Sequence, residues 1–136
     1  MNIRRTPNTV AAPFGPYSHA VEVPEGSRLL YISSEVGVLP DGTVPEGIEA
    51  QTEQALRNLA AVLEAAGTSM DGLVKTTIFY SDVSDFARLN EVYARHMPDP
   101  APARSAPANI RLPRGLLVSI DAIALLTAGD TVNTPR

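Results

Sequence analysis

The chain has 136 residues, a net charge of -4 at neutral pH and a sequence pI near 5.1. Without cysteine it has neither disulfides nor thiolate metal sites. An acidic chain in which 5% of the residues are aromatic and none is tryptophan does not favour nucleic-acid binding. No apolar run reaches the ~18 residues of a membrane span, and the N-terminus lacks the apolar core of a secretory signal. We therefore expect a cytoplasmic protein with one domain over residues 1–126 and a disordered tail over residues 127–136.

Turn residues divide the first third of the chain into short extended segments. The first dozen residues are expected to form a loose arm or an edge strand. A Gly-Pro turn and a turn at residues 24–27 then bound two strands, residues 18–23 and 28–36, which we expect to pair as a hairpin. Strict alternation along the second strand places Ser33 and Glu35 on the same face.

Two amphipathic helices follow, separated by a strand. The first helix is expected between Pro45 and Gly67, where glycine ends it, with apolar residues at helical spacing on one side. The strand at residues 73–80 is rich in β-branched residues. The second helix follows this strand, and Asp82 or Ser84 is expected to cap it.

Two more strands are expected at residues 103–110 and 116–126. Prolines in the former mark a sheet edge or a bulge, and the latter is apolar on both faces. The order β-β-α-β-α-β-β with right-handed crossovers predicts an α+β fold, in which both helices cover the same face of one mixed sheet. Because the chain offers no third helix to cover the other apolar face, we expect an oligomer.

Arg104 stands alone among small and cyclic residues in the segment Pro102-Ala103-Arg104-Ser105-Ala106-Pro107. If its side chain enters a cleft, the planar guanidinium is suited to a carboxylate or phosphate held by two parallel hydrogen bonds. The alternative is an internal ion pair with an acid of the same fold, such as Asp121 or Glu35.

Several stretches, taken in chain order, resemble a known family. They are Gly15-Pro16-Tyr17-Ser18, residues 51–59 with 63–67, residues 75–79 with 85–86, residues 90–93, and Pro102-Ala103-Arg104-Ser105. Together they resemble the reactive intermediate deaminase family, also called Rid, YjgF or L-PSP, over residues 13–126. The resemblance implies a chorismate-mutase-like fold and a homotrimer with the sheets inside, the helices outside and a cleft at each subunit interface.

The resemblance also implies an activity and a set of site residues. Members hydrolyse 2-imino or 2-enamino acids to 2-keto acids and ammonia without a metal or other cofactor. In the family, the arginine that matches Arg104 holds the substrate carboxylate, helped by the backbone N–H that matches Ala106. The residues that match Tyr17 and Ser33 line the same cleft, and Asn90 matches an asparagine near the site.

The chain departs from the family pattern at the acids. The usual glutamate of the last strand is Ser119, and the second acid of that strand is Asp121. Near the other wall, Ser33-Ser34-Glu35 replaces the usual Ser-Gly-Gln, so either Glu35 or Asp121 could substitute for the missing acid. A solvated or interface role for Asp121 is equally open. Lys75 fits an exposed strand position better than an imine-forming lysine.

Three functions are consistent with this pattern. The first is a cofactor-free imine or enamine deaminase. The second is a trimeric protein of the same fold that binds small carboxylates or regulates, and that lost hydrolysis with the glutamate. The third is a pathway-specific deaminase whose substrate supplies its own acid group. What separates them is whether Glu35 or Asp121 reaches a water beside the bound carboxylate.

Overall fold

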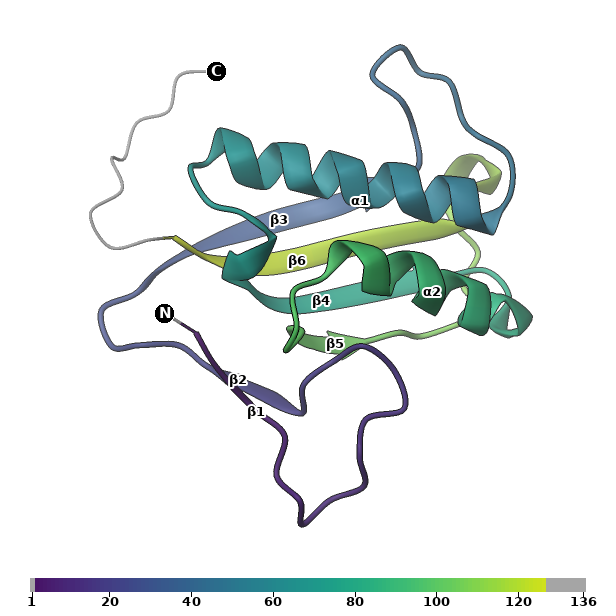
Figure 1. The fold of residues 1–136 in the computed structure, drawn as a ribbon. Helices are drawn as coiled ribbons and strands as arrows, with labels where there is room; N and C mark the ends of the chain where they lie inside the picture. Colours follow the sequence, from purple (N-terminus) through teal and green to yellow (C-terminus); the bar gives the residue numbers. More distant parts are fainter. Residues whose placement is uncertain (1, 127–136) are drawn as a thin grey trace.

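The computed structural model describes residues 2–126, so the expected tail at 127–136 lies outside the described residues. Two helices lie on one face of a four-stranded sheet, and a two-stranded sheet lies beside it (Figure 1). The α+β fold expected from the sequence is confirmed. The elements are β1 (Ile3–Arg5), β2 (Ala20–Glu22), β3 (Arg28–Val36), α1 (Ile48–Ala65), β4 (Leu73–Tyr80), α2 (Phe86–His96), β5 (Ala103–Ser105) and β6 (Val118–Leu126), with 3-10 turns at Met70–Gly72, Val83–Asp85 and Pro113–Gly115.

The main sheet has the strand order β3-β6-β4-β5. β6 pairs antiparallel with both β3 and β4, whereas β4 and β5 are parallel. β6 is apolar on both faces and accordingly lies inside the sheet. β5 is an edge strand and ends at Ser105, earlier than the sequence predicts. Beyond it the chain still follows β4, because the Tyr80 N–H donates to the Pro107 carbonyl (3.3 Å) and the Ile110 N–H donates to the Tyr80 carbonyl (3.1 Å).

Local chemistry explains where the helices end and begin. α1 ends with Gly67 at φ 85°, where the N–H groups of Gly67 and Thr68 donate to the carbonyls of Glu64 and Leu63, both at 3.0 Å. This is the Schellman arrangement, and it needs a residue that tolerates positive φ. Before α2, the Asp82 carboxylate accepts the Ser84 N–H (2.9 Å) and caps the 3-10 turn that leads into the helix.

The N-terminal pairing differs from the expected hairpin. β2 pairs with β1, with Arg4 opposite Val21, and not with β3. β3 instead pairs with β6, a partner distant in sequence. A turn with Gly26 at φ 78° separates β2 from β3 and sends them to different sheets. The first residues therefore form a strand, and Arg4 Nη2 ties it to the main sheet by donating to the Leu73 carbonyl (3.1 Å).

A β-bulge in β3 changes which side chains share a face. Ile32 lies opposite Ala122 of β6, but Glu35 lies opposite Ile120, one residue out of step with strict alternation. Opposed residues point to the same face of a sheet. Glu35 therefore shares the helix-covered face with the fully buried Ile120. The expectation that Glu35 and Ser33 share a face is wrong.

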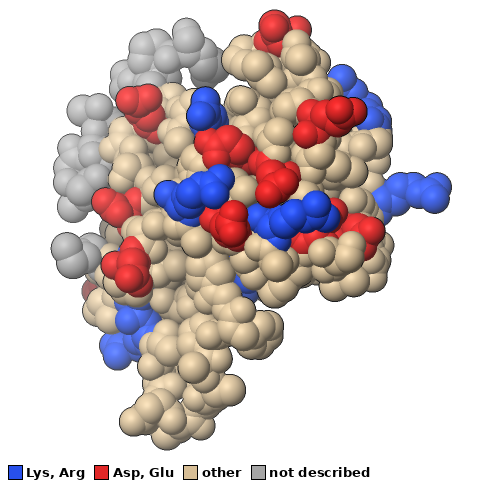
Figure 2. Space-filling model, turned by 45° about the vertical axis from the view of Figure 1, so that its right-hand side comes forward, with Lys and Arg blue, Asp and Glu red and all other residues tan. Residues whose placement is uncertain are grey.

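The core lies between the helices and one face of the sheet. Its fully buried members include Leu56, Leu59 and Leu63 of α1, Leu89 and Tyr93 of α2, and Ile78 and Ile120 of the sheet. On the outer surface, acidic and basic side chains are interspersed (Figure 2), partly as ion pairs such as Arg57–Glu53 (2.8 Å) and Arg95–Glu91 (3.8 Å). The opposite face of the sheet carries no helix within residues 2–126. There Tyr31 is 72% exposed.

Candidate functional site

Arg104 lies on the edge strand β5 and on the helix-covered side of the sheet. In the parallel pairing of β5 with β4, Arg104 lies opposite Thr76, whose side chain is fully buried. The Thr76 hydroxyl is hydrogen-bonded to the Tyr93 hydroxyl of α2 at 2.6 Å. Arg104 therefore faces the same layer as α2, at the edge where that layer ends.

Three aromatic rings and one amide surround the guanidinium. Its Nη1 donates to Asn90 Oδ1 at 2.6 Å, and its Cζ lies 5.1, 5.5 and 5.8 Å from the ring centroids of Tyr93, Tyr17 and Phe86. Ring faces attract a cation without neutralising it. Burial lowers the pKa of Arg104 from its usual value, but an arginine side chain stays protonated in proteins. Burial also raises the pKa of Tyr93 to about 12, so this phenol stays neutral.

No acid of the described chain neutralises Arg104. The ion pairs found within residues 2–126 do not include it, and its one side-chain hydrogen bond there goes to Asn90. The internal ion pair with Asp121 or Glu35, considered from the sequence, is absent. A half-buried guanidinium with uncommitted donors is suited to an external carboxylate.

The loop that carries Tyr17 is fixed beside Arg104 by backbone contacts. The buried Ser18 donates its N–H to the Pro102 carbonyl (3.2 Å) and its hydroxyl to the Ala101 carbonyl (2.6 Å). Gly15 lies directly against the guanidinium, since a Cβ there would be 2.6 Å from Nη2. A side chain at residue 15 would therefore collide with the guanidinium unless Arg104 moved.

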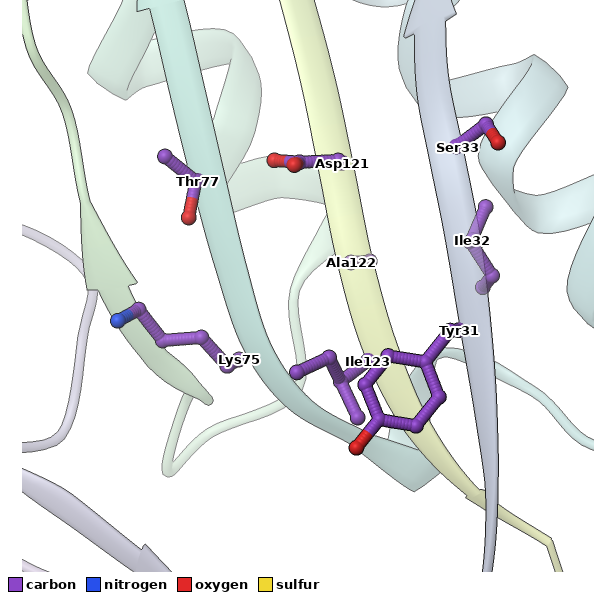
Figure 3. Close-up of a pocket in the computed structure, with 8 residues that line it drawn as sticks. All are labelled: Tyr31, Ile32, Ser33, Lys75, Thr77, Asp121, Ala122 and Ile123. Atoms are coloured by element: carbon purple, nitrogen blue, oxygen red, sulfur yellow. The ribbon is translucent and has the colours of Figure 1, made fainter.

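The other predicted residues lie elsewhere. Ala106 follows Arg104 closely in sequence and packs against the core. Ser33 lines a hollow of about 260 Å³ on the face of the sheet that carries no helix, together with Tyr31, Ile32, Lys75, Thr77, Asp121, Ala122 and Ile123 (Figure 3). Asp121 extends from β6 toward Thr77 of β4, and Lys75 extends away from it.

Asp121 is the carboxylate that opens into this hollow. Its Oδ1 is buried and has no hydrogen-bond partner among the described residues. Ser119 is 4% exposed, lies opposite Val36 and Phe79, and does not line the hollow. The Glu35 carboxylate lies on the helix side, where burial raises its pKa. Of the candidates for the missing acid, Asp121 has the best access to a ligand.

Within one chain, the Arg104 guanidinium and the hollow that contains Ser33 and Asp121 lie far apart. Arg104 is on β5 and Ser33 is on β3, the two edges of the sheet, and they belong to opposite faces. Three interstrand spacings separate those edges by about 14 Å. A site that uses both must be built between copies of the chain.

The sequence analysis did not identify Phe86 and Tyr93 of α2 as neighbours of Arg104. The signal was present in the spacing: Phe86, Asn90 and Tyr93 share one side of the helix. Two aromatics and an amide there form a surface suited to a cation. Only the position of β5 shows which cation it receives.

Residues 8–126 match the family model described as Endoribonuclease L-PSP. The chain belongs to the Rid (L-PSP) family. It is 42% identical over 127 residues to the mouse 2-iminobutanoate/2-iminopropanoate deaminase, covering 90% of this chain and 92% of the mouse protein. Among solved structures, RidA from an Antarctic Psychrobacter is 38% identical with a TM-score of 0.70, covering 91% of this chain and 99% of that one. E. coli TdcF with bound serine is 33% identical with a TM-score of 0.69, covering 90% and 94%.

The described residues of this Rid-family chain match neither the pattern of a membrane-spanning helix nor that of a cluster of metal ligands. Within residues 2–126, no helix is both long and apolar enough to cross a bilayer. The same residues contain no cluster of three or more histidine, aspartate or glutamate side chains placed to hold a metal ion.

Proposed function

We propose that this protein is a cytoplasmic, cofactor-free deaminase that hydrolyses 2-imino acids, or the enamines in equilibrium with them, to 2-keto acids and ammonia. The observation that carries the proposal is Arg104, a half-buried cation with aromatic rings around it and no carboxylate partner in the described chain. A 2-imino acid supplies the missing carboxylate. Relatives named as 2-iminobutanoate/2-iminopropanoate deaminases support this substrate class.

The reaction requires few protein groups. One water adds to the C=N carbon, and the resulting carbinolamine loses ammonia, so R–C(=NH)–COO⁻ and H₂O give R–CO–COO⁻ and NH₃. The imine is most electrophilic when protonated, and holding its carboxylate fixes the reacting carbon in place. Arg104 binds the carboxylate, with Asn90 fixing Nη1. We assign to the Ala106 N–H the supporting role that the family resemblance implies. Tyr17 lies over the guanidinium and forms one wall.

Proton transfer needs an acid or base, and we assign that role to Asp121. Its carboxylate lines the hollow with Ser33, and its Oδ1 lacks a donor within the described chain. A water placed there can give a proton to Asp121 as it attacks, and the same carboxylic acid can then protonate the departing amine. Ser119 is buried in the strand and contributes packing at this position.

The assembly that joins Arg104 and Asp121 is a homotrimer with the clefts between subunits. Tyr31, Leu29 and the hollow occupy the face that no helix covers, and a second copy would bury them. Packing these faces inside leaves the charged helix surface outside, in water (Figure 2). The family model is described as an endoribonuclease, but this chain supports that activity less well than it supports deamination. Its net charge of -4 does not provide the basic surface that RNA binding requires.

The test generates 2-iminopropanoate from L-alanine with an amino-acid oxidase and catalase, and follows release of pyruvate and ammonia. We expect the protein to accelerate release above the spontaneous rate, and Arg104→Ala to lose most of the acceleration at low imine concentration because it binds the carboxylate more weakly. The control Arg57→Ala removes an exposed arginine of α1 and should leave the rate unchanged. Pyruvate binding without acceleration would establish a carboxylate-binding protein instead.

A further inference from the structure

The half-buried Arg104 guanidinium lies between α2 and the loop that contains Gly15 and Tyr17. Tyr93 is fully buried behind the guanidinium, and Nη1 is hydrogen-bonded to Asn90. Nη2 lies against Gly15, where a Cβ would come within 2.6 Å of it, so only a residue without a side chain fits beside the guanidinium. A carboxylate bound to Nη2 is therefore placed next to the loop that contains Gly15.

That loop holds a large apolar side chain in water. Phe14 is 80% exposed, more than any other large hydrophobic residue of the described chain. Its ring meets the ring of Tyr17 edge-on, with the centroids 6.0 Å apart, and Tyr17 in turn lies 5.5 Å from the Arg104 Cζ. Single exposed apolar residues are common on protein surfaces. Phe14, however, packs against the Tyr17 ring, which in turn lies beside the Arg104 guanidinium.

The loop is held in place by its own contacts. The Tyr17 N–H donates to the Gly15 carbonyl (2.9 Å) across Pro16, whose ring restricts the backbone. On the other side of Tyr17, the His19 ring packs edge-on at 5.8 Å, and its Nε2 is hydrogen-bonded to the Ala11 carbonyl at 2.7 Å. Phe14 therefore projects from a structured turn, at a defined position relative to Arg104.

We propose that Phe14 contacts the side chain of the substrate and gives this protein a preference for 2-imino acids with larger apolar side chains, branched or aromatic. This inference rests on the proposed function. A substrate held by its carboxylate must direct its carbon chain away from the guanidinium, and the rings next to the guanidinium on the loop side are Tyr17 followed by Phe14. A methyl group ends one bond from the reacting carbon and cannot reach that far. An isobutyl or benzyl group can, and each methylene it buries favours binding by about fourfold.

The experiment compares kcat/KM for imines generated from L-alanine, L-leucine and L-phenylalanine in four proteins: wild type, Phe14→Ser, Phe14→Leu and the control Val62→Ala. Val62 is a partly exposed apolar residue on α1, away from the Tyr17 loop. We expect wild type to favour the two larger imines. Phe14→Ser should lower kcat/KM for them by about tenfold while the alanine-derived imine changes less than twofold. Phe14→Leu should recover most of the leucine-derived rate, and the control should match wild type.

Two outcomes would overturn the inference. An equal loss for all three imines in Phe14→Ser would mean that Phe14 supports the site in general and does not select side chains. A smaller particle in light scattering, restored by Phe14→Leu, would assign Phe14 to a contact between subunits. Calorimetry with pyruvate and 4-methyl-2-oxopentanoate separates this inference from the proposed function. If wild type hydrolyses no imine, a preference for the larger keto acid that Phe14→Ser removes still supports the Phe14 contact, and its absence refutes it.

Discussion

The Arg104 site and the Asp121 hollow are opposite in charge and alike in what they lack. Arg104 is surrounded by rings and donates one hydrogen bond to a neutral amide, whereas Asp121 has a buried oxygen with no donor in the described chain. Burying a charged group without a partner is costly, and folded chains keep such groups where a ligand or another subunit completes them. The two regions lie on opposite faces of one sheet, with Arg104 on β5 and Asp121 on β6. Each therefore resembles half of a site.

Replacing Asp121 with asparagine should have the largest effect on turnover. We expect kcat for 2-iminopropanoate to fall about 10²- to 10⁴-fold, the usual contribution of a general acid–base group. The melting temperature should not fall, since Oδ1 has no partner to lose within residues 2–126. Steady-state kinetics and thermal melts measure the two quantities. An unchanged kcat would return Asp121 to a role in packing or assembly.

Arg104→Ala should act on binding. Removing one partner of a hydrogen-bonded charge pair costs about 2–5 kcal/mol, so pyruvate should bind about 30-fold more weakly or worse. Arg104→Lys should recover only part of the lost affinity for pyruvate, because an ammonium group cannot make two parallel hydrogen bonds to a carboxylate. Calorimetry gives the affinities and circular dichroism checks the fold. Equal affinity for wild type and Arg104→Ala would show that this arginine serves the structure.

Mixing the Arg104→Ala and Asp121→Asn variants tests whether the arginine and the aspartate of one site come from different chains. If Arg104→Ala and Asp121→Asn subunits exchange freely, about a quarter of the interface sites combine an intact arginine with an intact aspartate. The whole mixture should then regain about a quarter of wild-type activity, measured after refolding the two proteins together. Activity that stays at the level of the separate variants would place both residues of a site in one chain.

Glu35→Gln should have the smallest effect, and it distinguishes Glu35 from Asp121. Burial raises the Glu35 pKa in the folded protein above its unfolded value of 4.5, so this carboxyl destabilises the folded state progressively as the pH rises above 4.5, and fully once the pH exceeds the folded pKa. The variant should melt a few degrees higher than wild type at pH 7, and this gain should vanish below pH 4. Deaminase activity should be unchanged. Lost activity would mean that Glu35 supplies the acid after all.

Local patterns in the sequence were sufficient for the secondary structure and much of the fold. Helical spacing of apolar residues predicts α1 and α2, Gly67 marks the end of α1, and the doubly apolar run at the C-terminal end predicts a central strand. The isolation of Arg104 among small residues also indicated a group without a nearby acid. These features depend on neighbours within a few residues, which is the range that sequence periodicity reports.

The tertiary structure alone decided strand partners, register and the surroundings of each charge. β2 pairs with β1 and not with β3, because β3 finds its partner some 90 residues further along in β6. One extra residue in β3 turns Glu35 to the helix side and leaves Ser33 on the other face. Since side chains alternate with a period of two, a single inserted residue reverses the assignment of every position after it. No local pattern records that insertion, and it is what separates Glu35 from the Asp121 hollow.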